Sequence, residues 1–177
     1  MASGLIFDPL KLLRLTPLLT STTSLTYAGN EHLYLSNFLA PQHKEKSDAI
    51  LPSYFRRLFN VGVWIVIGVN AVTIGSALVN VATLSPSPSS GGMLSRIFPG
   101  KMPSARWFYG AGALFQVLHF AYVPLVAYPV RDIVEGRSNE STREMKKWLD
   151  VHRIRVLTTD LPGWLSFLAA VLATISV

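Results

Sequence analysis

The sequence contains no cysteine and none of the short motifs that bind nucleotides or activate a serine. Without cysteine, a disulfide framework, an iron–sulfur cluster and a thiol nucleophile are all excluded. A P-loop, a Gly-x-Gly-x-x-Gly fingerprint and a Gly-x-Ser-x-Gly elbow are also missing, so nucleotide-driven and ordinary serine-hydrolase chemistry has no support. Charge is scarce as well, since only 15% of the residues are charged.

Apolar residues dominate what is present. Half of the 177 residues are hydrophobic, which is too many for an ordinary soluble domain, and the length suits one domain rather than two. We therefore expect residues 1–177 to form a single membrane domain whose main partner is the lipid bilayer. The net charge of +6 is spread between apolar runs rather than gathered in one stripe, so we expect no nucleic-acid partner.

Four windows of the sequence are long enough to cross a bilayer as helices, which takes about 20 residues each. The windows are residues 10–39, 58–84, 107–130 and 156–177. The first is the least apolar, because it carries many Ser and Thr residues and ends in Asn30, Glu31 and His32, so its neighbours must shelter it. The sequence thus predicts an all-α, four-helix transmembrane bundle. A flexible loop rich in Pro, Ser and Gly is predicted at 85–106.

The distribution of Lys and Arg predicts the orientation. The segments between the first and second windows and between the third and fourth hold 11 of these residues, and the opposite side holds 5. Because basic loops stay in the cytosol, both termini should face away from it. No sorting signal is evident, so an integral protein of the endoplasmic reticulum is the default expectation. The oligomeric state stays open.

Polar residues within and beside these windows recur every three or four positions, which places them on one face of each helix. Four such faces turned inward would form a polar pocket inside the bundle. The candidates are Tyr27, Glu31 and His32 in the first window, Asn70 in the second, Tyr109, Gln116 and His119 in the third, and Trp148, His152, Arg155 and Asp160 around the start of the fourth.

We expect two kinds of role among these candidates. Ionisable groups at membrane depth are rare without a task, so catalytic roles are predicted for His119, His152, Arg155, Glu31 and Asp160. Substrate-binding roles are predicted for His32, Asn70, Gln116, Tyr109, Tyr27 and Trp148. A structural alternative stands beside each of them: polar residues often only bond a neighbouring helix, His119 could be a neutral hydrogen-bonded histidine, and Tyr109 could be an interfacial belt residue.

Metal binding is not expected. His32, His119 and His152 come from three different helices, and Glu31 or Asp160 could complete a set of ligands. However, no His-x-x-x-His or Glu-x-x-His pair places two ligands on one helix face. We predict neither a metal nor an organic cofactor.

The segment that opens the fourth window resembles a known family. Its run of Trp148, His152 and Arg155, leading directly into an apolar helix, is similar to the last span of the small four-span fungal anthrone oxygenase-like membrane proteins. In that family a Trp, then a His or Asn, then an Arg opens the final helix. The following Asp160-Leu-Pro162-Gly-Trp164 segment is not part of the family pattern.

The resemblance implies an enzyme of polyketide-type secondary metabolism that oxygenates a polycyclic aromatic such as an anthrone, without flavin or haem. The partners would then be an apolar aromatic small molecule and dioxygen. An anthrone C–H is acidic, so His119 or His152 could act as the base, while Asn70, Gln116 or Arg155 stabilises the anionic oxygen.

Two other classes of function fit the same residues. A membrane-bound isoprenoid cyclase would use a carboxylic acid to protonate an alkene or epoxide, which would make Glu31 and Asp160 the critical residues. A tetraspan adaptor or a small transporter would need the polar faces mainly for packing.

Overall fold

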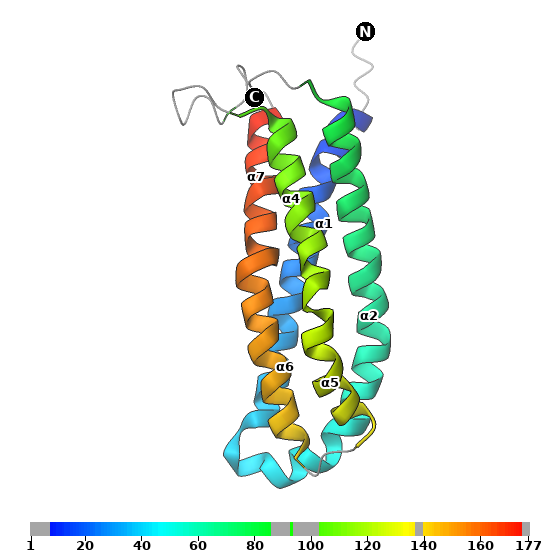
Figure 1. The fold of residues 1–177 in the computed structure, drawn as a ribbon, viewed down its shortest axis with the longest axis vertical. Helices are drawn as coiled ribbons and strands as arrows, with labels where there is room; N and C mark the ends of the chain where they lie inside the picture. Colours follow the sequence, from blue (N-terminus) through cyan, green and yellow to red (C-terminus); the bar gives the residue numbers. More distant parts are fainter. Residues whose placement is uncertain (1–7, 86–92, 94–102, 137–139, 175–177) are drawn as a thin grey trace.

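The computed structural model describes residues 8–85, 93, 103–136 and 140–174, and the described part is helical with no strand. Its helices form four rods that run side by side (Figure 1). The first two rods are α1 (Pro9–Ser36) and α2 (Lys44–Thr83), linked by the short 3-10 turns η1 (Asn37–Leu39) and η2 (Pro41–His43). The third consists of α4 (Ala105–His119), η3 (Phe120–Tyr122) and α5 (Val123–Val134), and the fourth of α6 (Ser141–Arg155), η4 (Val156–Asp160) and α7 (Leu161–Thr174).

The all-α, four-helix architecture predicted from the sequence is confirmed. Two helices begin well before the predicted windows, α2 at Lys44 rather than at 58 and α6 at Ser141 rather than at 156. The reason is that the charged connectors continue the helices beyond the apolar stretch, so each helix is longer than the membrane span it was predicted to contain. Most of the loop predicted at 85–106 lies outside the described residues.

Three helical segments are long and apolar enough to cross a membrane. They are Pro41–Thr83, Ala105–Val134 and Ser141–Thr174. The helix α1 is not among them, so the fourth span stays a prediction. The beginning of α1 and the end of α7 lie at the same end of the bundle (Figure 1), the arrangement that an even number of crossings produces. Which side of a membrane that end faces also stays a prediction.

Hydrogen bonds from all three other rods hold α1. Several of its own hydroxyl groups, such as those of Thr16 and Thr22, are satisfied by carbonyls one turn earlier in the same helix. The inter-rod bonds join Asn80 Nδ2 to the Leu13 carbonyl at 2.9 Å, Tyr109 Oη to the Arg14 carbonyl at 2.7 Å, the Thr73 and Thr20 hydroxyls at 2.7 Å, Trp164 Nε1 to Thr22 Oγ1 at 2.8 Å, and His152 Nε2 to the Ala28 carbonyl at 3.0 Å. The most polar helix is therefore sheltered by its neighbours.

Polar side chains are buried inside the bundle, and large apolar side chains are exposed on its outside. The side chains of Asn70 and Gln116 are at most 1% exposed, whereas Trp64 and Trp107 are each 71% exposed. An apolar exterior around buried polar groups suits a lipid environment better than water. Apolar clusters of buried residues also pack the rods together, one around Leu35, Phe55 and Met145 and another around Ala77, Tyr109 and Phe167.

Close packing of the third and fourth rods depends on a glycine. A Cβ atom at Gly112 in α4 would collide with the Phe167 ring in α7. We expect Gly112→Ala to destabilise the protein by about 1–3 kcal/mol, because the buried ring has to move. Thermal unfolding in detergent measures this effect.

The matched control is Gly75→Ala in α2, where an added Cβ meets nothing within 4 Å. That variant should be unchanged or slightly more stable, since Ala favours helix by about 0.5–1 kcal/mol over Gly. Equal unfolding temperatures for the two variants would contradict the packing described here.

Candidate active site

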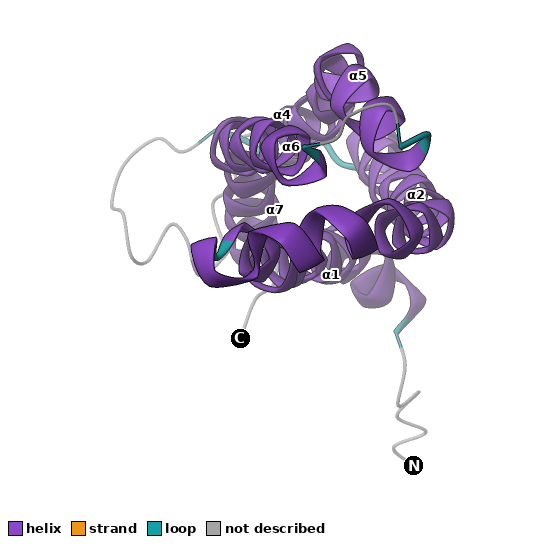
Figure 2. Cartoon of the chain, turned by 90° about the horizontal axis from the view of Figure 1, so that it is seen from below, coloured by secondary structure: helices purple, strands orange, loops and turns teal. Residues whose placement is uncertain are grey.

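A cavity of about 540 Å³ lies among the rods, with α2 and α5 forming most of its walls. Figure 2 shows the four rods arranged around the interior, with α5 facing both α2 and α6. Most of the lining is aliphatic or aromatic, as in typical pockets for apolar small molecules. Its polar lining includes Glu31 from α1, His119 from the end of α4 and Arg155 from the end of α6, together with Asn60, Arg131, Glu135 and the Trp148 indole.

The third rod changes its helix type beside the cavity. The helix α4 ends at His119, and the 3-10 turn η3 separates it from α5, whose first turn contains Pro124. Proline lacks the backbone N–H that would continue the hydrogen-bond ladder of α4. The break places His119 and Phe120 at the cavity wall, at the junction between the two helices.

The fourth rod contains a π-helical turn, η4, at the same level. The N–H of Leu161 bonds the carbonyl of Val156, five residues earlier. In a π-helix, residues five apart share a face, whereas in an α-helix they do not. Arg155 and Asp160 therefore lie together, with Arg155 Nε 3.4 Å from Asp160 Oδ2.

His119 and Asp160 form a buried pair. Nδ1 of His119 lies 2.8 Å from Asp160 Oδ1, and both side chains are at most 5% exposed. The carboxylate can only accept, so Nδ1 donates and carries a proton. Within the described residues Nε2 of His119 has no hydrogen-bond partner. Thr159 also donates to Asp160 Oδ1, at 3.2 Å, and so helps to fix the carboxylate.

His152 lies behind the cavity wall and holds Arg155. Its Nδ1 accepts from the Arg155 guanidinium at 3.1 Å, because an arginine can only donate. Its Nε2 then donates to the Ala28 carbonyl at 3.0 Å. Both ring nitrogens are occupied, and the pattern requires the neutral form of the ring with the proton on Nε2.

Two aromatic rings flank His152. The Trp148 ring, which lines the cavity, stacks on it with centroids 4.8 Å apart. On α1, the His32 ring lies parallel to it at 6.5 Å. His32 does not line the cavity, and its Nδ1 is buried without a hydrogen-bond partner in the described part of the chain. The imidazole of His152 is thus fixed by stacking as well as by hydrogen bonds.

Glu31 reaches the cavity beside a glycine. Tyr27, one turn earlier on α1, interacts with the Glu31 carboxyl. Both side chains lie against Gly62 of α2, where an added Cβ would collide with the Tyr27 hydroxyl. A larger residue at position 62 would therefore displace the pair.

Four of the predicted site residues line the cavity, namely Glu31, His119, Trp148 and Arg155. Asp160, His152, His32 and Tyr27 lie next to them, and the other three predicted residues make contacts elsewhere. Asn70 is fully buried and bonds the Val66 carbonyl within α2. Gln116 is buried in the contact between α4 and α7, close to Gly163. Tyr109 lies ten residues before His119, about 15 Å away along α4, and bonds the Arg14 carbonyl. The structure thus brings together Glu31, His119, Trp148, His152, Arg155 and Asp160, with Tyr27 and His32 beside them.

Several cavity residues were not singled out from the sequence. Phe55, Phe59, Phe120 and Arg131 line the walls, and Gly62 makes room for Tyr27. The phenylalanines look like ordinary membrane-helix residues in the sequence, so no signal marks them. Pro124 and the polar Tyr122 do mark the break in the third rod, and this signal could have pointed to Phe120.

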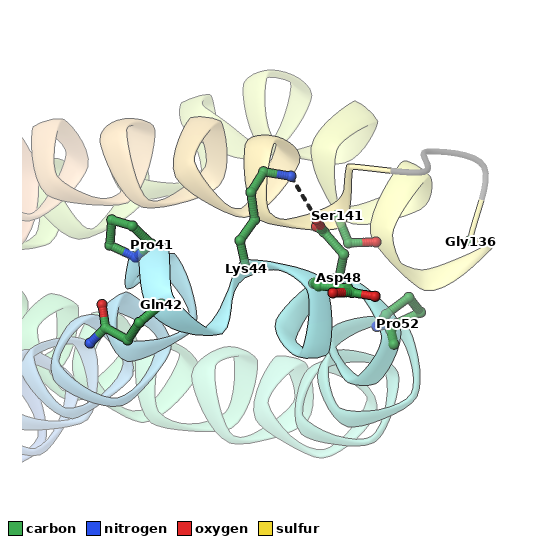
Figure 3. A pocket seen from close by; sticks show the side chains of 9 residues that line it. Pro41, Gln42, Lys44, Asp48, Pro52, Gly136 and Ser141 are labelled. Atoms are coloured by element: carbon green, nitrogen blue, oxygen red, sulfur yellow. Dashed lines mark hydrogen bonds and ion pairs between the residues drawn. The ribbon is translucent and has the colours of Figure 1, made fainter.

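A second hollow, of about 750 Å³, lies at the charged end of the bundle and contains none of the predicted site residues. Figure 3 shows Lys44 and Asp48 among the residues that line it. The Asp48 carboxylate accepts from Lys44 Nζ at 2.8 Å and from the Thr142 backbone N–H at 2.7 Å. It thus caps the beginning of α6, which gives this polar end a structural role.

No protein-family model and no solved structure matches the chain. Three curated fungal proteins match almost its whole length. The epoxidase pydX of Acremonium sp is 32% identical over 171 residues, which cover 96% of this chain and 98% of the relative. The probable epoxidase scpX of Mollisia scopiformis is 29% identical over 167 residues (92% and 96%), and the epoxidase gkaX of Penicillium citrinum is 29% identical over 163 residues (91% and 93%).

These names refine the resemblance inferred from the sequence. The names of the relatives agree with an oxygenase, but they are epoxidase and probable epoxidase and not anthrone oxygenase. The identity with pydX and the nearly complete coverage of both chains place the protein in a family: it belongs to the small fungal epoxidases represented by pydX, scpX and gkaX.

Proposed function

We propose that this protein is a membrane-embedded oxygenase of fungal secondary metabolism, which epoxidises an apolar, polyketide-type substrate in the cavity beside His119. The observation that carries the proposal is the His119–Asp160 pair at the wall of an apolar cavity. A full-length similarity to proteins named epoxidases supports the reaction type. The substrate would partition into the bilayer and enter from the side.

Electron balance narrows the kind of substrate. Forming one epoxide from dioxygen also forms one water, which requires two electrons and two protons. A hydroquinone or an enolised ketone supplies both itself, according to SH2 + O2 → SO + H2O. An anthrone oxidised to a quinone has the same balance, so the predicted aromatic substrate and the epoxidase name are compatible. Neither reaction in this form draws electrons from a cofactor.

His119 is proposed as the base that starts the reaction. Its Nδ1 donates to Asp160, which leaves Nε2 with the lone pair that can accept a proton. Removing the acidic O–H or C–H proton of the substrate gives a delocalised anion that reacts with dioxygen. The resulting hydroperoxide then loses water in one of two ways. Either the neighbouring enol carbon bonds the proximal peroxide oxygen and expels hydroxide, which takes up the enol proton as water and leaves the epoxide, or the C–H and O–OH bonds break together to yield a ketone and water. Asp160 keeps the imidazole oriented and stabilises its protonated form.

Arg155 is proposed to stabilise the substrate anion. Its guanidinium lines the cavity and is held by Asp160 on one side and His152 on the other. A fixed cation in an apolar site costs little reorganisation when charge develops. His152 has no free nitrogen, so the geometry favours a positioning role for it, rather than the role of base that the sequence also allowed.

The cyclase alternative now rests on one residue. Asp160 is bonded by His119 and Thr159 and paired with Arg155, so of the two acids predicted from the sequence Glu31 is the one that lines the cavity. No specific feature of the described residues favours an adaptor or a transporter. The absence of a metal and of a cofactor stays a prediction, as do the endoplasmic reticulum location and the oligomeric state.

Replacing His119 tests the base. We expect His119→Ala to lower oxygen-dependent turnover by about 10²–10⁴, the usual contribution of a general base. Membranes that contain the protein are given anthrone or 2-methyl-1,4-naphthohydroquinone under ¹⁸O2, and ¹⁸O in the product is counted by mass spectrometry. The control is His43→Ala in η2, an exposed histidine far from the cavity. Full turnover in the His119 variant would refute the assignment.

Replacing Asp160 by Asn tests the orientation of His119. The amide keeps the shape of the side chain but can present an N–H to Nδ1, which would favour the wrong tautomer. We expect Asp160→Asn to lower kcat by about 100-fold or more while changing KM little. Asp150→Asn on the exposed surface of α6 serves as the control, because Asp150 pairs with Lys146 and does not line the cavity. A change in KM alone, with kcat intact, would contradict the proposed role.

A further inference from the structure

Glu31 lines the cavity but has no part in the oxygenation step proposed above. It comes from α1, whereas His119 comes from the end of α4, so the two groups reach a bound substrate from different walls. Gly62 leaves room for the Tyr27–Glu31 pair against α2. A carboxyl group and an imidazole base on one apolar cavity are the two parts needed for acid–base opening of a strained ring.

Charge balance favours a protonated Glu31. Asp160 must be ionised to accept from His119 and to pair with Arg155, so the Arg155 guanidinium already has its counter-ion. A second carboxylate among apolar walls would be costly. Among these apolar walls the protonated form of Glu31 is therefore favoured over the ionised form. Tyr27 lies beside it as a hydrogen-bonding neighbour.

We propose that the cavity also opens the epoxide that it forms, with Glu31 as the acid and His119 as the base. This rests on the proposed function, because that reaction supplies the epoxide. Glu31 gives its proton to the epoxide oxygen as one C–O bond breaks. A hydroxyl nucleophile attacks the carbon, forms the new C–O bond and loses its proton to His119 Nε2, and return of that proton to Glu31 restores the site.

The nucleophile is an O–H group, either water or a hydroxyl of the substrate itself. Oxygenation releases one water in the same cavity, so water is at hand there. Attack by water gives a 1,2-diol, and attack by an internal hydroxyl gives a cyclic ether that is an isomer of the epoxide. The two sources differ in whether solvent oxygen appears in the product.

The test supplies the epoxide directly and omits dioxygen. Purified full-length protein in detergent is incubated under argon in H2¹⁸O with trans-stilbene oxide, and separately with 4,5-epoxyhexan-1-ol. We expect the native protein to give diol containing one ¹⁸O from the first probe or unlabelled cyclic ether from the second. Glu31→Gln should slow the opening by about 100-fold. Glu45→Gln, at the exposed polar end of α2, should open the epoxide at the native rate.

A second variant guards against loss of structure. Tyr27→Phe keeps the ring near Gly62 and removes only the hydroxyl that lies between Gly62 and Glu31, so it should slow opening by a smaller factor than Glu31→Gln. Under air with the hydroquinone probe, Glu31→Gln should still consume dioxygen and accumulate unopened epoxide. That readout separates a catalytic role from unfolding.

Two results would overturn the inference. One is native protein that opens neither probe above the detergent blank, and the other is Glu31→Gln that opens them at the native rate. Both would leave oxygen-dependent turnover untouched, so the proposed function could survive them. Conversely, ring opening under argon without any ¹⁸O2 incorporation under air would refute the oxygenase proposal and leave this activity in place.

Discussion

The constraint on which the structure depends is that hydrophilic groups inside an apolar shell have to satisfy one another. With Trp64 and Trp107 outside and Asn70, Gln116, His119 and Asp160 inside, the bundle has the polarity of a protein surrounded by lipid. A buried polar group without a partner is costly, so each inter-rod hydrogen bond helps to hold the fold. The polar helix α1 illustrates this, because bonds from all three other rods fix it.

The same constraint builds the site. Asp160 neutralises Arg155 and orients His119, Arg155 fixes His152, and His152 bonds α1 through the Ala28 carbonyl. These contacts form one continuous chain from α4 to α1. Each of these side chains is held by at least one hydrogen bond or ion pair, so the lone pair on His119 Nε2 has a defined position. Stability and chemistry are supplied by the same hydrogen bonds, so variants in the network need a stability readout beside the activity.

Helical periodicity made much of this predictable. The four rods follow from apolar windows of membrane-spanning length, and the inward faces that carry Glu31, His119, Trp148 and His152 follow from spacings of three and four. Periodicity assigns a face but not a depth, which is why Tyr109 was grouped with residues about 15 Å away along α4. Arg155 and Asp160 meet because of the π-helical turn between them, and a spacing of five residues in the sequence does not predict such a turn. The cavity itself depends on Gly62 and on the break at η3, and both act only through tertiary contacts.

The central claim is that the buried network sets the two histidines in opposite tautomers, so that only His119 offers a free nitrogen to the cavity. Solid-state NMR of ¹⁵N-histidine-labelled protein in lipid bilayers, with assignment by His119→Gln and His152→Gln, measures this directly. We expect a proton on Nδ1 and none on Nε2 for His119, and the reverse for His152. A proton on Nε2 of His119, or the same tautomer in both rings, would contradict it.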